Sequence, residues 1–74
     1  MTVNELFNVW LHNKNPYASV NVWDRHNGDY IFMTNSPLPN QNAEEIGKME
    51  VKCFYTSDEK GKNPILTINV GEYN

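Results

Sequence analysis

The dipeptide Asn27-Gly28 is the feature that most constrains how this 74-residue chain folds. A type I′ turn needs a positive φ at both central positions, and Asn-Gly is well suited to that conformation. Residues 17–24 before it alternate between apolar and polar side chains with the period of a strand, and residues 29–34 form the second arm. We therefore expect a hairpin with a two-residue loop.

This loop determines the register of the first hairpin, because each residue before it has one partner after it. Trp23 should lie opposite Phe32, and Val22 opposite Met33. In that register the aliphatic side chains of both strands share one face, whereas a slip of one residue would mix the two faces. The aromatic residues are then expected on the other face.

A second hairpin is expected where residues 49–57 and 65–70 alternate in the same way. A loop at Lys60-Gly61 would pair Val51 with Val70 and Cys53 with Ile68. The apolar side chains again fall on one face. Cys53 is then predicted to be a buried thiol.

An amphipathic helix is expected over residues 3–12. The sequence Thr2-Val3-Asn4-Glu5 has the form of a capping box, in which Thr2 and Glu5 satisfy each other's backbone N–H groups. Pro16 cannot continue a helix, so the helix should end before it. The apolar stripe that should face the sheet consists of Val3, Leu6, Phe7, Trp10 and Leu11.

Residues 35–48 are expected to form a structured crossover loop. Pro37 and Pro39 resist regular structure, while Asn42 and Gly47 suit the cap and the end of one helical turn. Together the elements predict a single α+β domain over residues 1–74. In it, the N-terminal helix packs on one face of a four-stranded antiparallel sheet, in the order α-β-β-loop-β-β.

Charge and cysteine content narrow the function. Nine acidic and six basic residues give a net charge of −3, and the bases form no run, so duplex nucleic acid is not an expected partner. Cys53 is the only cysteine, which excludes an internal disulfide and favours a reducing compartment. No apolar run is typical of a signal peptide or a membrane span, so we expect a cytoplasmic protein with no membrane partner.

No group of residues predicts chemistry. His12, His26 and Cys53 fall at a helix end, in a turn and in the core, which is too scattered for a metal site. The pair Glu44-Glu45 has no apolar pocket around it that would let one carboxyl act as an acid and the other as a base. We expect no catalytic residue, no cofactor and no metal, and therefore no enzyme.

The second face of the predicted sheet carries more aromatic side chains than a solvated surface needs. Cross-strand aromatic pairs stabilise a sheet by roughly 0.2–1 kcal/mol each, which is one explanation. A binding surface is the other, because Trp, Tyr and Arg anchor protein interfaces. The candidate partner-binding residues are Tyr17, Trp23, Arg25, Tyr30, Phe32, Lys52 and Phe54.

Three kinds of occupant of this face remain open at this point. A host protein or a second copy of the chain would bury on the order of 800 Å² on each partner. Single-stranded nucleic acid or a nucleotide would stack its bases on Trp23, Phe32 and Phe54, with Arg25 and Lys52 nearby. The third kind of occupant is a second copy in a homodimer, which is either purely structural or holds a small planar ligand between its copies.

Several segments together resemble a loose group of small α-β-β-loop-β-β proteins encoded by phages and prophages of AT-rich, low-GC Gram-positive bacteria. These segments are ELFNVW, ASVNVWDRHNGDYIF, SPLPN and KMEVKCFYTSDEKGKNPILTINV. The resemblance implies a non-enzymatic inhibitor or accessory factor that acts on a host protein in the bacterial cytosol. The group includes inhibitors of defence systems such as anti-CRISPR proteins. A net charge of −3 is mild compared with nucleic-acid mimics, so the resemblance favours contact through the aromatic face.

Overall fold

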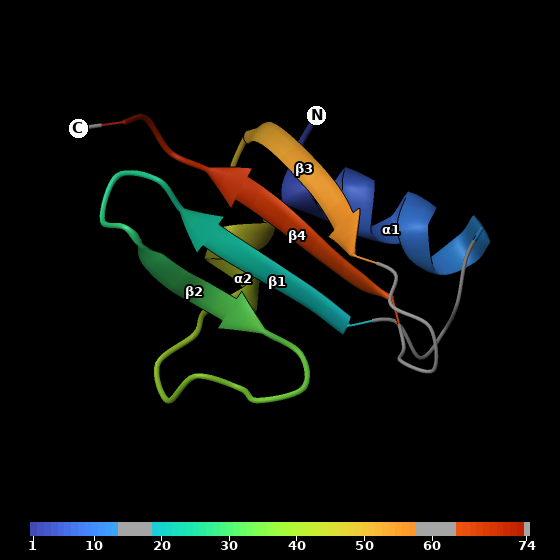
Figure 1. The fold of residues 1–74 in the computed structure, drawn as a ribbon, viewed down its shortest axis with the longest axis horizontal. Helices are drawn as coiled ribbons and strands as arrows, with labels where there is room; N and C mark the ends of the chain where they lie inside the picture. The colour runs from blue at the N-terminus through green and yellow to red at the C-terminus, as the bar shows by residue number, and fades with distance from the viewer. Residues whose placement is uncertain (14–18, 58–63, 74) are drawn as a thin grey trace.

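The computed structural model describes residues 1–13, 19–57 and 64–73, and the side chains of residues 10–13 lie outside this description. Its elements are α1 (Val3–Asn13), β1 (Ser19–Asp24), β2 (Asp29–Met33), α2 (Ala43–Gly47), β3 (Val51–Ser57) and β4 (Ile65–Val70). Both helices lie on one side of a four-stranded sheet (Figure 1). We call this the helix side and the opposite side the open face. The predicted α+β class is confirmed.

The start of α1 is built as the sequence predicts. The Thr2 N–H donates to Glu5 Oε1 at 2.9 Å, and the Glu5 N–H donates to Thr2 Oγ1 at 3.3 Å. Hydrogen bonding of the Glu5 carboxylate to Thr2, first to its backbone N–H and then to its side chain, holds the pKa of Glu5 below its ordinary value. The Val3 N–H also donates to the Met49 carbonyl at 3.0 Å, which fastens the helix to the chain entering β3.

The short helix α2 interrupts the crossover segment, and the helical turn predicted there is confirmed. Asn42 is its N-cap, and the Asn42 Oδ1 accepts the Glu45 N–H at 3.1 Å. Gly47 packs against α1, since a Cβ at this position would lie 2.5 Å from the Asn4 side-chain amide. This close approach brings the two helices together over the sheet.

The sheet has the strand order β2-β1-β4-β3, and its two central strands are parallel. Both hairpins are antiparallel, as predicted, but the prediction of a fully antiparallel sheet is wrong. The hairpins join through their most apolar strands, β1 and β4, because these gain most by being buried in the middle. Their alternate side chains are at most 1% exposed: Val20, Val22, Leu66, Ile68 and Val70.

The first hairpin does not have the predicted register. Asp24 lies opposite Asp29 and Trp23 opposite Tyr30, so residues 25–28 form a four-residue turn. A type I′ turn would need a positive φ at Asn27 as well, yet only Gly28 has one, at 72°. An irregularity next to Val22 then places Phe32 opposite Val22, on the helix side.

The second hairpin keeps one predicted pair and loses the others. Val51 lies opposite Val70 as expected, but an irregularity between Val51 and Cys53 shifts the rest of β3 by one residue. Cys53 therefore lies opposite Asn69 on the open face and is exposed, so its predicted burial is wrong. The predicted loop at Lys60-Gly61 lies outside the described residues.

The core lies between the helices and the two central strands. Val3 and Leu6 from α1 and Ile46 from α2 are buried against the aliphatic side chains of β1 and β4. Partly buried apolar side chains extend this core toward both edges of the sheet. They are Phe7, Ile31, Phe32 and Val51.

Gly71 and Gly28 provide a matched test of the segment that follows β4. Both have positive φ, 79° and 72°, but a Cβ on Gly71 would lie 2.5 Å from Asp24 Oδ1, whereas a Cβ on Gly28 would meet nothing within 4 Å. We expect Gly28→Ala to lose about 1 kcal/mol of unfolding free energy from its backbone alone. Gly71→Ala should lose at least about 2 kcal/mol, because a steric clash is added. Urea denaturation measures both, and equal losses would contradict the packing of Gly71 on Asp24.

Candidate functional site

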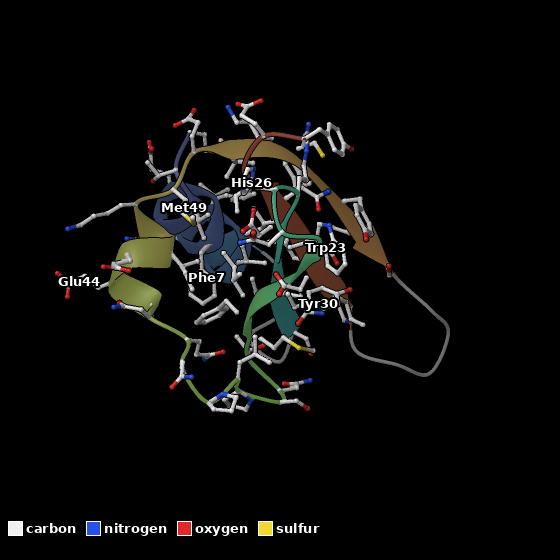
Figure 2. All side chains as sticks on the ribbon, turned by 90° about the vertical axis from the view of Figure 1, so that its left-hand side faces the viewer. Phe7, Trp23, His26, Tyr30, Glu44 and Met49 are labelled. Carbon is white, nitrogen blue, oxygen red and sulfur yellow. The ribbon has the colours of Figure 1, made fainter. Side chains whose placement is uncertain are left out.

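The open face carries two rows of side chains that run across the sheet. Residues directly opposite each other in paired strands point to the same side, so the rows follow from the observed register. The first row contains Tyr30, Trp23, Asn69 and Cys53, and the second contains Met33, Asn21, Thr67 and Tyr55. Figure 2 shows Trp23 and Tyr30 on the side of the sheet away from Phe7 and the helices.

Aromatic rings dominate this open face. The rings of Trp23 and Tyr30 pack edge to face, with centroids 4.8 Å apart and planes at 80°. Tyr30 is 40% exposed and Tyr55 is 52% exposed. Thr67, in the middle of the face, is only 4% exposed, so the neighbouring side chains close over it. The face is thus a partly packed surface with aromatic side chains on three of its strands, β1, β2 and β3.

The structure brings together some of the predicted partner-binding residues and separates others. Trp23 and Tyr30 are on the open face as expected. Phe32 and Phe54 are on the helix side, opposite Val22 and Ile68, so the expectation that they share the aromatic face is wrong. The physical reason is the irregularity in each hairpin, which reverses the side of every residue beyond it. Tyr17 lies outside the described residues.

The two predicted cationic residues contact the segment that follows β4. The Arg25 guanidinium carbon lies 3.8 Å from the centroid of the Tyr73 ring, within the range of a cation–π interaction. Lys52 Nζ lies 2.6 Å from Glu72 Oε1, and this hydrogen bond lowers the pKa of Glu72. Both cations are therefore engaged within the chain.

Sequence reasoning missed Tyr55, Cys53 and Met33 as residues of the open face. The alternation of apolar and polar residues assigns each residue to a side of the sheet only while the strand pairing is regular. No residue pattern near Val22 or Cys53 marks the two irregularities. Cys53 is held in place by Asn69, whose Nδ2 donates to Sγ at 3.2 Å.

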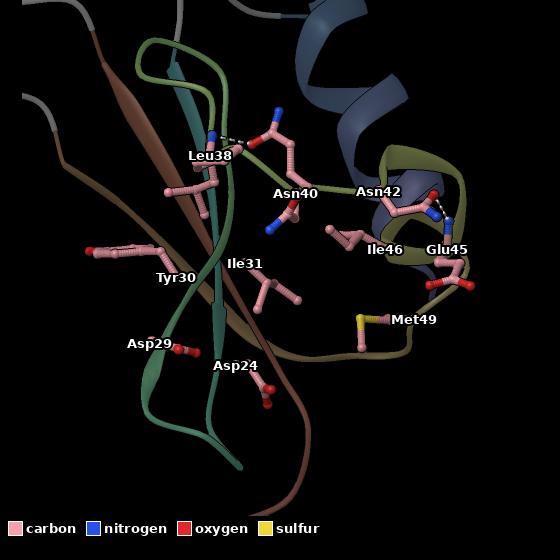
Figure 3. Close-up of a pocket in the computed structure, with 12 residues that line it drawn as sticks. Asp24, Asp29, Tyr30, Ile31, Leu38, Asn40, Asn42, Glu45, Ile46 and Met49 are labelled. Atoms are coloured by element: carbon pink, nitrogen blue, oxygen red, sulfur yellow. Dashed lines mark hydrogen bonds between the residues drawn. The ribbon is translucent and has the colours of Figure 1, made fainter.

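A separate cleft of about 500 Å³ lies on the helix side, between β2 and α2. Gln41 shapes it, since Gln41 Oε1 accepts the N–H groups of Met33 at 3.1 Å and Leu38 at 3.0 Å, which ties the crossover segment to β2. Figure 3 shows the Tyr30 ring on the other side of β2, away from this cleft. The cleft is lined by Asp24, Asp29, Tyr30, Ile31, Leu38, Pro39, Asn40, Gln41, Asn42, Glu45, Ile46 and Met49.

Within the described ranges, no group of three or more His, Cys, Asp or Glu residues is arranged to hold a metal ion. No described helix is long and apolar enough to cross a membrane. Comparison of the chain with protein-family models, with characterised proteins and with solved structures finds no match.

The exposure of Cys53 gives a direct test of this face. Because the thiol lies on the open face, a thiol reagent should modify it in the folded protein at a rate within about tenfold of that in urea. The alternative register, in which Cys53 faces Ile68, predicts modification only after unfolding. Ellman's reagent followed by absorbance distinguishes the two, and complete protection of the native thiol would contradict the observed register.

Proposed function

We propose that the chain is a small non-catalytic binding protein that engages a partner protein through the open face of its sheet. One observation carries the proposal: Trp23, Tyr30 and Tyr55 stand on a face that neither helix covers. The residues among them are polar and small, Asn21 and Thr67 above all. Aromatic anchors within a polar surround are the composition of protein interfaces.

The aromatic content of this face exceeds what the fold uses for burial. The largest fully buried side chains of the described residues lie on the helix side, where the two helices cover the sheet. Tyr55 is 52% exposed, so most of its ring contributes little to the core. A large aromatic group left in solvent gains free energy when a partner covers it, at about 25 cal/mol per Å² of apolar area.

A protein fits this face better than single-stranded nucleic acid does. Nucleic-acid platforms combine stacking rings with cations that contact phosphates. Here Lys52 already pairs with Glu72, Arg25 already stacks on Tyr73, and the chain has a net charge of −3. Two of the rings expected to stack bases, Phe32 and Phe54, are on the other side of the sheet.

We further propose that the partner is a host protein and that the chain acts on it as an inhibitor or accessory factor, as in phage-encoded anti-defence proteins. The support is the sequence resemblance described above.

Affinity capture from a lysate of a low-GC Gram-positive bacterium tests the proposal. Tyr55→Arg changes an exposed residue of the open face, so it should keep the fold and lose the captured protein. Phe54→Ala is the matched control, because Phe54 is equally exposed, at 51% against 52% for Tyr55, but lies on the helix side. Circular dichroism verifies that both variants fold.

We expect the Phe54→Ala variant to retain the partner and the Tyr55→Arg variant to lose at least about 90% of it, since an interface anchor is typically worth 2 kcal/mol or more. Retention by both variants would refute the role of the open face. Recovery of nuclease-sensitive nucleic acid instead of protein would favour the nucleic-acid alternative. A stable homodimer in light scattering, with no further partner captured, would favour the structural homodimer.

A further inference from the structure

The cleft between β2 and α2 has an aliphatic floor. Ile31 from β2, Ile46 from α2 and Met49 from the segment after α2 point toward one another across it (Figure 3). Ile31 is half-buried and Met49 is 37% exposed, so both present apolar surface to the cleft. Its volume of about 500 Å³ is within the usual range for ligand sites.

The charges around this floor are all negative. Among the twelve described residues that line the cleft, Asp24, Asp29 and Glu45 are acidic and none is Lys, Arg or His. Asp29 lies near the β1–β2 turn and Glu45 lies on α2 at the opposite wall (Figure 3). A cleft with one sign of charge attracts ligands of the other sign.

The pairing of β1 with β2 gives an independent reason to expect a cation. Asp24 and Asp29 are directly opposite each other, and like charges in such a pair destabilise a sheet. Asp24 accepts hydrogen bonds from the His26 N–H and from Asn27 Nδ2, each at 2.9 Å, but both donors are neutral groups. No Lys or Arg of the described residues forms an ion pair with either carboxylate. A cation bound here would relieve the repulsion.

We propose that this cleft binds a lysine side chain of a partner protein. The methylene stem lies on Ile31 and Met49, and the ammonium lies beside Asp29, with Glu45 adding attraction from the opposite wall. Lysine carries an apolar stem and a terminal charge, which is the combination that the floor and the rim present. The cleft is on the helix side, so this inference does not rest on the function proposed for the open face.

An NMR titration with three capped tripeptides tests the site. The probes are acetyl-Gly-Lys-Gly-amide and its norleucine and glutamate counterparts, of which norleucine keeps the stem without the charge. The lysine peptide should give saturable shifts at the backbone amides of Ile31, Asn40, Ile46 and Met49. The norleucine peptide should bind at least about threefold more weakly, and the glutamate peptide more weakly still. Added salt should weaken the binding of the lysine peptide and of no other probe.

Two variants locate the ammonium. The Asp29→Asn variant should bind the lysine peptide about three- to fivefold more weakly, and its affinity for the norleucine peptide should be unchanged. Glu44→Gln is the matched control, since Glu44 neighbours Glu45 on α2 but pairs with Lys48 and does not line the cleft. Asp29 is exposed and its side chain caps nothing in the described structure, so its variant should fold.

Three results would overturn the proposal. One is equal affinity for the lysine and norleucine peptides, which would leave only an apolar cleft. Another is an unchanged affinity of the Asp29→Asn variant for the lysine peptide. The third is a set of shifts confined to the open face, with the amides of the cleft unmoved.

Discussion

The parallel pairing of β1 with β4 is the interaction on which the rest of the structure depends. Val22 and Ile68 lie side by side in this pair, and neither is exposed to solvent. Both helices pack onto this aliphatic strip, and each hairpin contributes its other strand, β2 or β3, as an edge. Because the strip faces only the helix side, the opposite face is left without a covering layer. The open face is therefore a consequence of how the core is built.

Irregular pairing at the two edges of the sheet then decides which aromatic residues reach that open face. One shift in each hairpin turns Phe32 and Phe54 toward the helix side and Tyr55 toward the open face. Such irregularities cost ladder hydrogen bonds, and proteins use them to redirect side chains near binding sites. In the first hairpin the four-residue turn after Asp24, and not this irregularity, brings Asp29 opposite Asp24 at the end of the cleft. The open face and the cleft thus depend on different parts of the β1–β2 pairing.

Local features were predictable from the sequence, and non-local ones were not. The capping box at Thr2, the helical turn after Asn42 and the antiparallel pairing in both hairpins each depend on residues close together in the chain. The parallel pair of central strands depends on which hairpin edges bury the most area, which short-range patterns do not encode. The turn after Asp24 was misassigned because its carboxylate binds the turn and favours four residues over two. A separate feature, the irregularity between Val22 and Trp23, moved Phe32 out of the candidate site.

The assignment of residues to the two sides of the sheet underlies both the open face and the cleft. The measurement that tests it most directly is a NOESY spectrum of the side chains of β3 and β4. The observed register predicts contacts from the Phe54 ring to the Ile68 methyl groups and from the Tyr55 ring to the Thr67 methyl group. Strong contacts from the Tyr55 ring to the Leu66 methyl groups, with none to Thr67, would contradict it.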